Sequence, residues 1–188
     1  MNLPQQLQVA LKEWAVVCDA LATGRQMLLL RKGGISETGG EFEVEHRAFL
    51  LFPTYLHQNP EMVKDELRAT IEPHAVEPNQ IVLASAAVVT DIVQLTWRQQ
   101  MDAIDDQHIW TSPLIDMRFN YRPDRPLYLM LLRAYQLPAP LMIENTRAYW
   151  GCKSWVPLME SIVTADAIPV LDDAKFYATR DEILKETR

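Results

Sequence analysis

The apolar residues near the start of the chain recur at spacings of three and four positions. They are Leu7, Leu11, Trp14, Cys18 and Leu21. Such spacing places side chains on one face of a helix, and Gly24 follows where a left-handed C-cap residue is expected. The pattern therefore predicts a helix that ends before Gly24. A short, apolar, buried strand is predicted next, at Gln26–Arg31.

Residues 28–46, LLLRKGGISETGGEFEVEH, join a leucine run to two glycine pairs and an alternating charged segment. Five of the six glycines lie between positions 24 and 40. Because glycine adopts backbone conformations that other residues avoid, the chain is expected to turn sharply here, which would let a ligand approach its backbone. Phe42–Phe52 is predicted as the return strand of a hairpin, with Phe42, Val44 and His46 on one face. A charged hairpin and a ligand-binding loop both fit this stretch.

The remaining pattern predicts helices inserted between strands. The expected elements are a helix at 60–72 ended by Pro73, a strand or bent pair of strands at 81–97, a helix at 98–108 with a capping box formed by Thr96 and Gln99, a strand at 127–137 leading into an extended LPAP segment, a last strand at 151–158 and a C-terminal helix from Asp172. This irregular order indicates an α+β fold, a small mixed or antiparallel β-barrel with inserted helices and a C-terminal helix. One domain is expected over residues 1–188, with its barrel core at about 11–158 and a helical tail at about 172–188.

The net charge of −7 argues against a protein that binds nucleic acid through bulk charge. The charge is nevertheless uneven, because residues 109–155 hold six basic residues against three acidic ones. This stretch is interpreted either as a solvated surface of mixed sign or as a face that attracts an anionic ligand. Two cysteines, no secretory segment and no membrane-length apolar run predict a soluble, cytoplasmic protein that does not engage a membrane.

Several signatures of common enzymes are missing from the sequence. The glycine-rich stretch lacks the spacing of a dinucleotide or phosphate-binding loop, and neither a nucleophile elbow nor a His-Glu-x-x-His pair occurs. A kinase, a dehydrogenase and a zinc protease are therefore disfavoured, and no cofactor is expected. Cys152 lies beside Lys153, but no histidine is close in sequence to activate its thiol.

A group of carboxylates and imidazoles suggests a different kind of site. Glu41, Glu43 and Glu45 alternate with apolar residues, and His46 and His57 flank the same predicted strand. Such groups, when close together, bind divalent metals or act as acid–base pairs. The alternative function is accordingly a metal-dependent hydrolase or nuclease that uses Glu43, Glu45, His46 and His57. A solvated strand edge whose charges deter aggregation explains the same residues without chemistry.

Aromatic residues near loops and strand ends often have a basic neighbour in the sequence. They are Tyr55, Trp97, Trp110, Tyr121, Trp150 and Trp155. An aromatic ring beside an arginine is what stacking on a nucleobase requires, although core packing uses the same residues. Arg133 lies within the apolar segment LMLLRAYQL, which predicts a structural ion pair for its guanidinium.

Five long phrases carry a resemblance to an uncharacterised bacterial family, the domain-of-unknown-function family 1802. They are LKEWAVVCDAL, LLLRKGGI, FEVEHRAFLLFPTYLHQ, LMLLRAYQLPAP and GCKSWVPL, within residues 11–158. The family implies little about function beyond an association of some members with restriction-type endonucleases. More distantly, Ala-Leu-Ala-Thr-Gly-Arg-Gln followed by a strand ending in Arg31 resembles the opening of PUA-like domains of the ASCH and EVE kind. The chain departs from these in Arg25-Gln26, where a lysine is common, and in the helix at 60–72.

The PUA-like resemblance implies a pocket for a nucleobase beside the barrel. We therefore expect a non-catalytic domain that binds nucleic acid or a modified nucleotide, with a nuclease partner in a restriction or defence system. The predicted ligand-binding residues are Arg31, Lys32, Tyr55, Trp110, Arg118, Arg122 and Trp155. No metal is expected at that site. A protein–protein interaction module remains a third interpretation.

Overall fold

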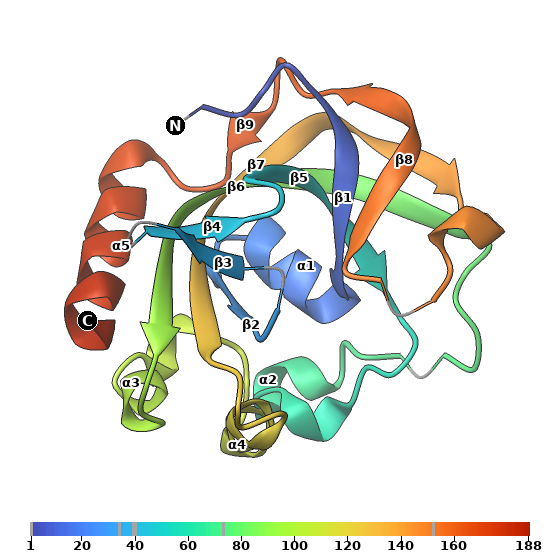
Figure 1. Cartoon of the computed structure of the whole chain (residues 1–188). Coiled ribbons are helices and arrows are strands. Elements are labelled where there is room, and N and C mark those ends of the chain that lie inside the picture. Colours follow the sequence, from blue (N-terminus) through green and yellow to red (C-terminus); the bar gives the residue numbers. More distant parts are fainter. Residues whose placement is uncertain (1, 34, 39–40, 73, 152) are drawn as a thin grey trace.

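The computed structural model describes residues 2–33, 35–38, 41–72, 74–151 and 153–188, without the side chains of 35–38 and 41–43. A twisted sheet of seven strands dominates the fold, in the order β2-β7-β6-β5-β1-β8 with β9 paired to β7 (Figure 1). The strands are β1 Gln6–Trp14, β2 Leu28–Arg31, β5 Ala48–Thr54, β6 Gln80–Leu95, β7 Leu127–Glu144, β8 Trp155–Val163 and β9 Ile168–Pro169.

The sheet is mixed, which confirms the predicted α+β class. β1 pairs with β5 in parallel, whereas its other neighbour, β8, and the remaining pairs run antiparallel. Within the described residues β2 and β8 form the two ends of the order, so the predicted barrel is not confirmed. β2 is only four residues long, and a strand this short offers few backbone groups to close a barrel.

β6 and β7 form the longest ladder, and it bends where its register shifts. Shifts occur between Leu83 and Ser85 and between Val89 and Asp91, so the predicted strand at 81–97 is one bent strand. The LPAP segment runs extended within β7, as expected. Its prolines fall between Gln136 and Leu141, where the register shifts, and therefore remove no hydrogen bond from the ladder.

Helices cover the sheet at one face and at one end. They are α1 Ala15–Ala22, α2 Asp65–Arg68, α3 Gln99–Asp102, α4 Ser112–Asn120 and α5 Asp173–Thr187, with short 3-10 turns at Pro60–Met62, Asp105–Gln107 and Arg147–Tyr149. Figure 1 shows α2, α3 and α4 gathered at one end of the molecule. The predicted C-terminal helix is confirmed, and the Asp172 carboxylate accepts a hydrogen bond from the backbone N–H of Lys175 at 2.8 Å.

The prediction of a helix over the first apolar repeat is wrong in its N-terminal half. Leu7 and Leu11 lie in β1, and only the later residues of the repeat, Cys18 and Leu21, belong to α1. A spacing of four fits both a helical face and alternate positions of a strand, and in the structure Leu7 and Leu11 pack into two different core clusters. The predicted turn is confirmed, because Gly24 has a φ of +70° just after α1.

Two further elements differ from their predicted bounds. The helix expected at 60–72 is split into the turn Pro60–Met62 and α2, because Val63 is extended and forms an isolated bridge with Trp110. The predicted return strand divides as well. Its first part is β4, Glu41–Val44, which pairs with β3, Ile35–Thr38, in a separate two-stranded sheet, while its second part is β5.

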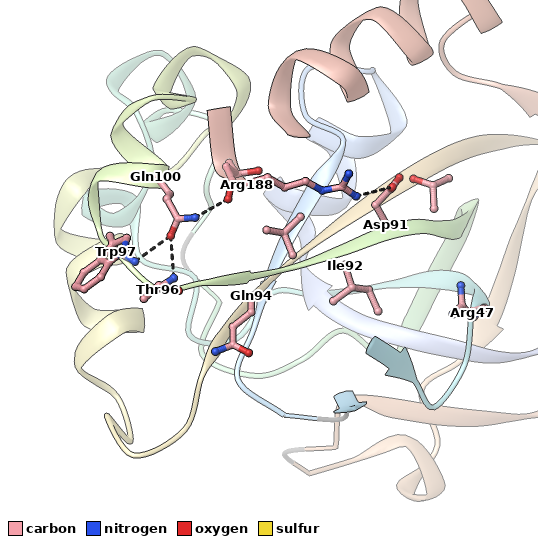
Figure 2. A pocket seen from close by; sticks show the side chains of 11 residues that line it. Arg47, Asp91, Ile92, Gln94, Thr96, Trp97, Gln100 and Arg188 are labelled. Atoms are coloured by element: carbon pink, nitrogen blue, oxygen red, sulfur yellow. Dashed lines mark hydrogen bonds and ion pairs between the residues drawn. The ribbon is translucent and has the colours of Figure 1, made fainter. Parts of the chain in front are cut away.

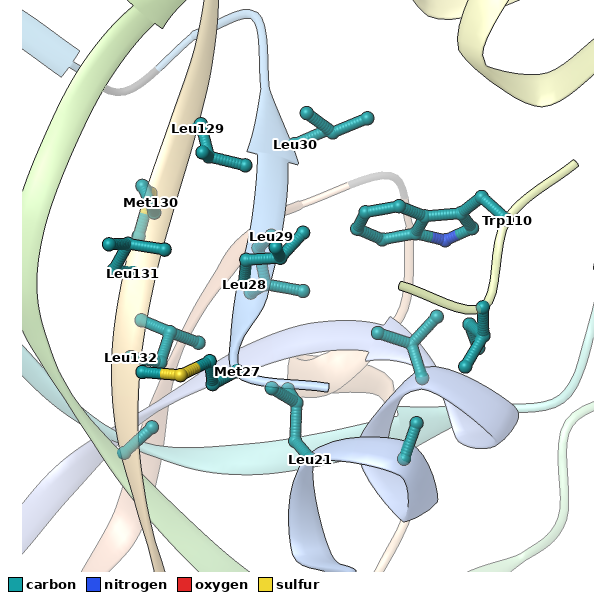
Figure 3. Packing of buried hydrophobic residues seen from close by; sticks show 14 of the residues in the cluster. Leu21, Met27, Leu28, Leu29, Leu30, Trp110, Leu129, Met130, Leu131 and Leu132 are labelled. Atoms are coloured by element: carbon teal, nitrogen blue, oxygen red, sulfur yellow. The ribbon is translucent and has the colours of Figure 1, made fainter. Parts of the chain in front are cut away.

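The larger hydrophobic core lies between β2, β7, α1 and the segment that carries α4. Leu28 and Leu29 of β2 are completely buried, as are Leu129 and Leu131 on the paired strand. Figure 3 shows Trp110 directed toward β2 from the side opposite to β7. This packing presses the segment before α4 against β2 and so brings residues far apart in the sequence to one end of the sheet.

Candidate nucleic-acid interface

A cleft of about 500 Å³ opens where β1, β2 and β5 end beside α4. The strand ends contribute Trp14, Arg31 and Thr54. Four basic side chains and one acidic side chain line this basic cleft, and they are Lys12, Arg31, Arg118, Lys153 and Glu13. Although the whole chain is acidic, the charge balance within the cleft therefore favours an anionic ligand.

Arg31 is a largely buried cation of the cleft. Its side chain is only 14% exposed, and its NH1 lies 3.9 Å from the Glu13 carboxylate. Burial lowers the pKa of Arg31, Glu13 opposes this shift, and Arg118 adds to it. Because a guanidinium stays protonated in proteins, Arg31 is a largely buried positive charge. Its ion pair with Glu13 is long. An anion in the cleft would supply closer hydrogen bonds.

Arg118 reaches the same cleft from α4. Its NH2 donates a hydrogen bond of 2.7 Å to the backbone carbonyl of Leu30 in β2. The bond joins the helix to the end of the strand that carries Arg31 and fixes the two guanidinium groups on one wall. Since a guanidinium has five N–H donors, one bond to a carbonyl leaves others for a ligand.

The two lysines come from neighbouring segments: Lys12 lies in β1, and Lys153 lies in the turn before β8, which is bonded to β1. Lys12 donates through Nζ to the carbonyls of Tyr149 and Gly151, and its backbone N–H donates to Ser154 at 2.8 Å. Lys12 thus holds the turn in place. Lys153 is exposed at the mouth of the cleft, where its charge faces solvent.

Of the seven residues predicted to bind a ligand, the structure brings three together in the cleft: Arg31, Trp110 and Arg118. Trp110 is 4% exposed, and its ring packs beside that of His108 at a centroid distance of 5.6 Å. Only a small part of the Trp110 side chain therefore lines the cleft. Most of its surface belongs to the core.

The other four predicted residues lie outside the lining of the cleft. Lys32 donates to the carbonyls of Phe119, Arg122 and Arg125 at 2.9, 3.2 and 3.1 Å, and so closes the end of α4. The guanidinium of Arg122 lies 5.2 Å from the Tyr121 ring.

The two remaining aromatic residues pack against other side chains. Trp155 meets His46 and Phe49 edge-on, each at a centroid distance of 5.1 Å. Tyr55 lies 5.1 Å from the ring of His74. Sequence reasoning missed Lys12, Glu13 and Trp14 as cleft residues because it placed them on a helix rather than at the end of a strand.

The alternative set of Glu43, Glu45, His46 and His57 is spread along the chain. His46 lies 3.6 Å from Glu45, but the seven residues of β5 separate His46 from His57. At about 3.3 Å per residue, that strand alone spans roughly 20 Å. The side chain of Glu43 and the whole of Cys152 lie outside the described residues. Within the described part of the chain, no three His, Cys, Asp or Glu residues are grouped as metal ligands.

A second hollow of about 760 Å³ lies beside β6, α3 and the end of α5. Figure 2 shows Gln100 there, and its Oε1 accepts from the backbone N–H groups of Thr96 and Trp97 at 2.8 and 2.9 Å. The predicted capping box of Thr96 and Gln99 is therefore wrong: Arg98 is the N-cap residue of α3, and Gln100 is the side chain that bonds back to Thr96 and Trp97. Asp91 is bound by both arms of Arg180, at 2.5 and 2.7 Å. Its charge is compensated within the protein, so this larger hollow is a weaker ligand site than the basic cleft.

The prediction that Arg133 forms a structural ion pair is confirmed. Its guanidinium pairs with Asp173 at the start of α5 and lies 5.0 Å from the ring of Phe176. Among the described residues, no helix combines the length and the apolar character needed to cross a membrane.

Comparison with known proteins identifies one family. The family described as "Domain of unknown function (DUF1802)" matches residues 10–182. No curated protein matches the chain. Among solved structures, ASCH from Zymomonas mobilis is 10% identical, covers 96% of this chain and 95% of its own, and has a TM-score of 0.45. A mutant form of the same protein is 11% identical, with 95% and 98% covered and a TM-score of 0.45.

Proposed function

The chain belongs to the DUF1802 family, and from its own residues we propose that the basic cleft binds a phosphate of a nucleic acid or modified nucleotide without catalysis. The observation that carries this proposal is Arg31, a guanidinium that is 14% exposed and whose described ion pair to Glu13 is 3.9 Å long. A phosphate oxygen offers a planar guanidinium two short, charge-assisted hydrogen bonds.

The surroundings of Arg31 support a phosphate in preference to a neutral ligand. Arg118 and the two lysines add three positive charges, against which Glu13 is the single carboxylate of the described lining. Arg118 is already held by the carbonyl of Leu30, so a ligand would find it in place and lose little free energy to ordering it.

The size and the walls of the cleft also suit part of a nucleotide. Its volume of about 500 Å³ lies within the range of about 300–1,000 Å³ typical of small-molecule sites. Met117, which is 46% exposed, gives it an apolar wall next to the charges, which a sugar or base edge can contact while the phosphate meets the arginines.

Fluorescence anisotropy with labelled DNA and RNA oligonucleotides at two salt concentrations tests the proposal. Each phosphate neutralised on a single strand contributes about 0.7 to the slope of log affinity against log salt concentration. Arg31→Gln removes one cation while keeping a polar side chain. We expect it to weaken binding about tenfold and to reduce that slope by about one phosphate contact.

Arg25→Gln is the matched control. Arg25 is an exposed arginine paired with Glu66, and it lies outside the cleft lining. It should bind like the unmodified protein at both salt concentrations. Equal affinities of the Arg31→Gln variant and the unmodified protein would show that the cleft does not hold the phosphate.

A further inference from the structure

An apolar groove of about 730 Å³ adjoins the basic cleft. Lys12, Trp14, Thr54 and Lys153 line both hollows, so one ligand can occupy the two at once. Beyond these four shared residues, the groove is lined by Phe52, Leu56, Val76, Trp150 and Gly151. Its lining is therefore mainly apolar, whereas that of the cleft is charged.

Trp150 is exposed to an unusual degree for a tryptophan. It is 55% exposed, and its indole N–H donates to the carbonyl of Asn145 at 3.1 Å. The polar edge of the ring is thus satisfied by the protein. The guanidinium of Arg147 lies over the ring, 6.0 Å from its centroid, and more than half of the residue's surface stays exposed to water. A large apolar surface kept in water beside a charged cleft is typical of a binding site.

The position of Trp150 is fixed by its neighbours. Lys12 donates to the carbonyls of Tyr149 and Gly151, on either side of Trp150. Gly151 has a φ of +91°, a conformation that side-chain-bearing residues rarely adopt. These contacts position the backbone of Trp150, and the bond to Asn145 together with Arg147 over the ring holds the side chain at the groove. Little ordering is therefore needed when a ligand binds.

The charges around the groove are compatible with a nucleic acid. Glu77 is the one carboxylate of the described lining, and its two oxygens accept the backbone N–H groups of Tyr55 and Leu56, each at 3.0 Å. Its charge is thereby directed into the protein. Lys153, at the boundary with the cleft, presents a positive charge where the backbone of a strand would pass from one hollow to the other.

We propose that the apolar groove takes an unpaired nucleobase, stacked on Trp150, of a strand whose phosphate lies in the basic cleft. The inference rests on the proposed function and names its ligand class, a single-stranded nucleic acid. A duplex keeps its bases stacked and paired within the helix, so that a base reaches a groove beside the backbone only at a cost in unpairing. An unpaired base meets no such cost, and aromatic stacking accepts any of the four bases.

The test measures anisotropy of three labelled probes of equal length: a single strand, a duplex, and a single strand whose central nucleotides are abasic. The unmodified protein should bind the single strand about tenfold more tightly than either other probe. Trp150→Ala should remove about tenfold in affinity for the single strand and leave binding of the abasic strand unchanged, because the abasic strand keeps its phosphates.

Trp97→Ala is the control for loss of an exposed tryptophan. Trp97 is 68% exposed and lines the second hollow, away from the groove (Figure 2). This variant should bind all three probes like the unmodified protein. Thermal unfolding of both variants checks that each remains folded.

Two further outcomes separate the inference from the proposed function. Equal binding of single strand, duplex and abasic strand, lost on Arg31→Gln but unaffected by Trp150→Ala, would leave the phosphate cleft intact and overturn the base groove. Absence of binding to every probe by the unmodified protein would overturn both.

Discussion

His108 makes the stability of the fold depend on pH in a way that the structure quantifies. Its side chain is fully buried, and its Nε2 lies 3.9 Å from Asp105. Burial first, and then the nearby charge of Lys64, lower the pKa of His108 from 6.5 to about 4. Within the described chain, neither ring nitrogen forms a hydrogen bond of good geometry, although the backbones of Met101 and Trp110 lie close.

The sign of the effect follows from which state binds the proton. Below pH 6.5 an unfolded His108 takes up a proton, whereas the folded protein keeps it neutral down to about pH 4. The free energy of unfolding therefore falls as the pH drops from 6.5 to 4, and below that the contribution of His108 is constant. A pKa difference of about 2.5 units corresponds to a loss of about 3 kcal/mol over this interval.

Urea unfolding followed by tryptophan fluorescence, at several pH values between 7 and 4, measures this loss. His108→Leu and His108→Gln both remove the titrating group, the first without and the second with a polar side chain. Carboxylates also titrate in this range, so the informative quantity is the difference in slope between each variant and the unmodified protein. Both variants should lose about 3 kcal/mol less than the unmodified protein. Parallel curves for all three proteins would refute the reasoning.

Two backbone positions give further predictions. Gly24→Ala should lower the free energy of unfolding by about 1–3 kcal/mol, because φ is +70° there and a Cβ would lie 2.6 Å from Cδ2 of Leu171; urea unfolding measures it. Gly151→Ala is its control, since a Cβ there meets nothing within 4 Å, and an equal loss at both positions would contradict a role for the contact. Asp172→Ala should cost about 1 kcal/mol by removing the N-cap of α5, whereas Asp172→Asn keeps an acceptor and should cost less; equal losses in thermal unfolding would argue against the cap.

The success of the sequence predictions depended on how local each signal was. Gly24, the strand that ends at Arg31, and the helix after Asp172 were all predicted, because a turn residue, a short apolar run and a capping carboxylate act within a few residues of themselves. The first apolar repeat was ambiguous. The spacing of Leu7 and Leu11 fits a helix and a strand equally well. The segment forms a strand because it pairs with β5 and β8.

The cleft shows the same division at the level of the site. Arg31 and Arg118 were singled out from the sequence as basic residues suited to an anionic ligand. The sequence could not place them together, because the bond from Arg118 to Leu30 joins residues 88 positions apart. Lys32, their neighbour in the prediction, is instead occupied by three carbonyls at the end of α4.

By itself, the sequence determined the mixed α+β character of this protein, the positions of its main turns and the presence of a basic stretch in an acidic chain. Only the tertiary structure decided that Lys12 lies near the end of a strand, that Lys153 lines the same cleft, and that an exposed Trp150 lines the adjoining groove. The physical reason is that periodicity and capping are short-range, whereas β1 pairs with β5 residues 40 positions away and with β8 residues more than 140 positions away.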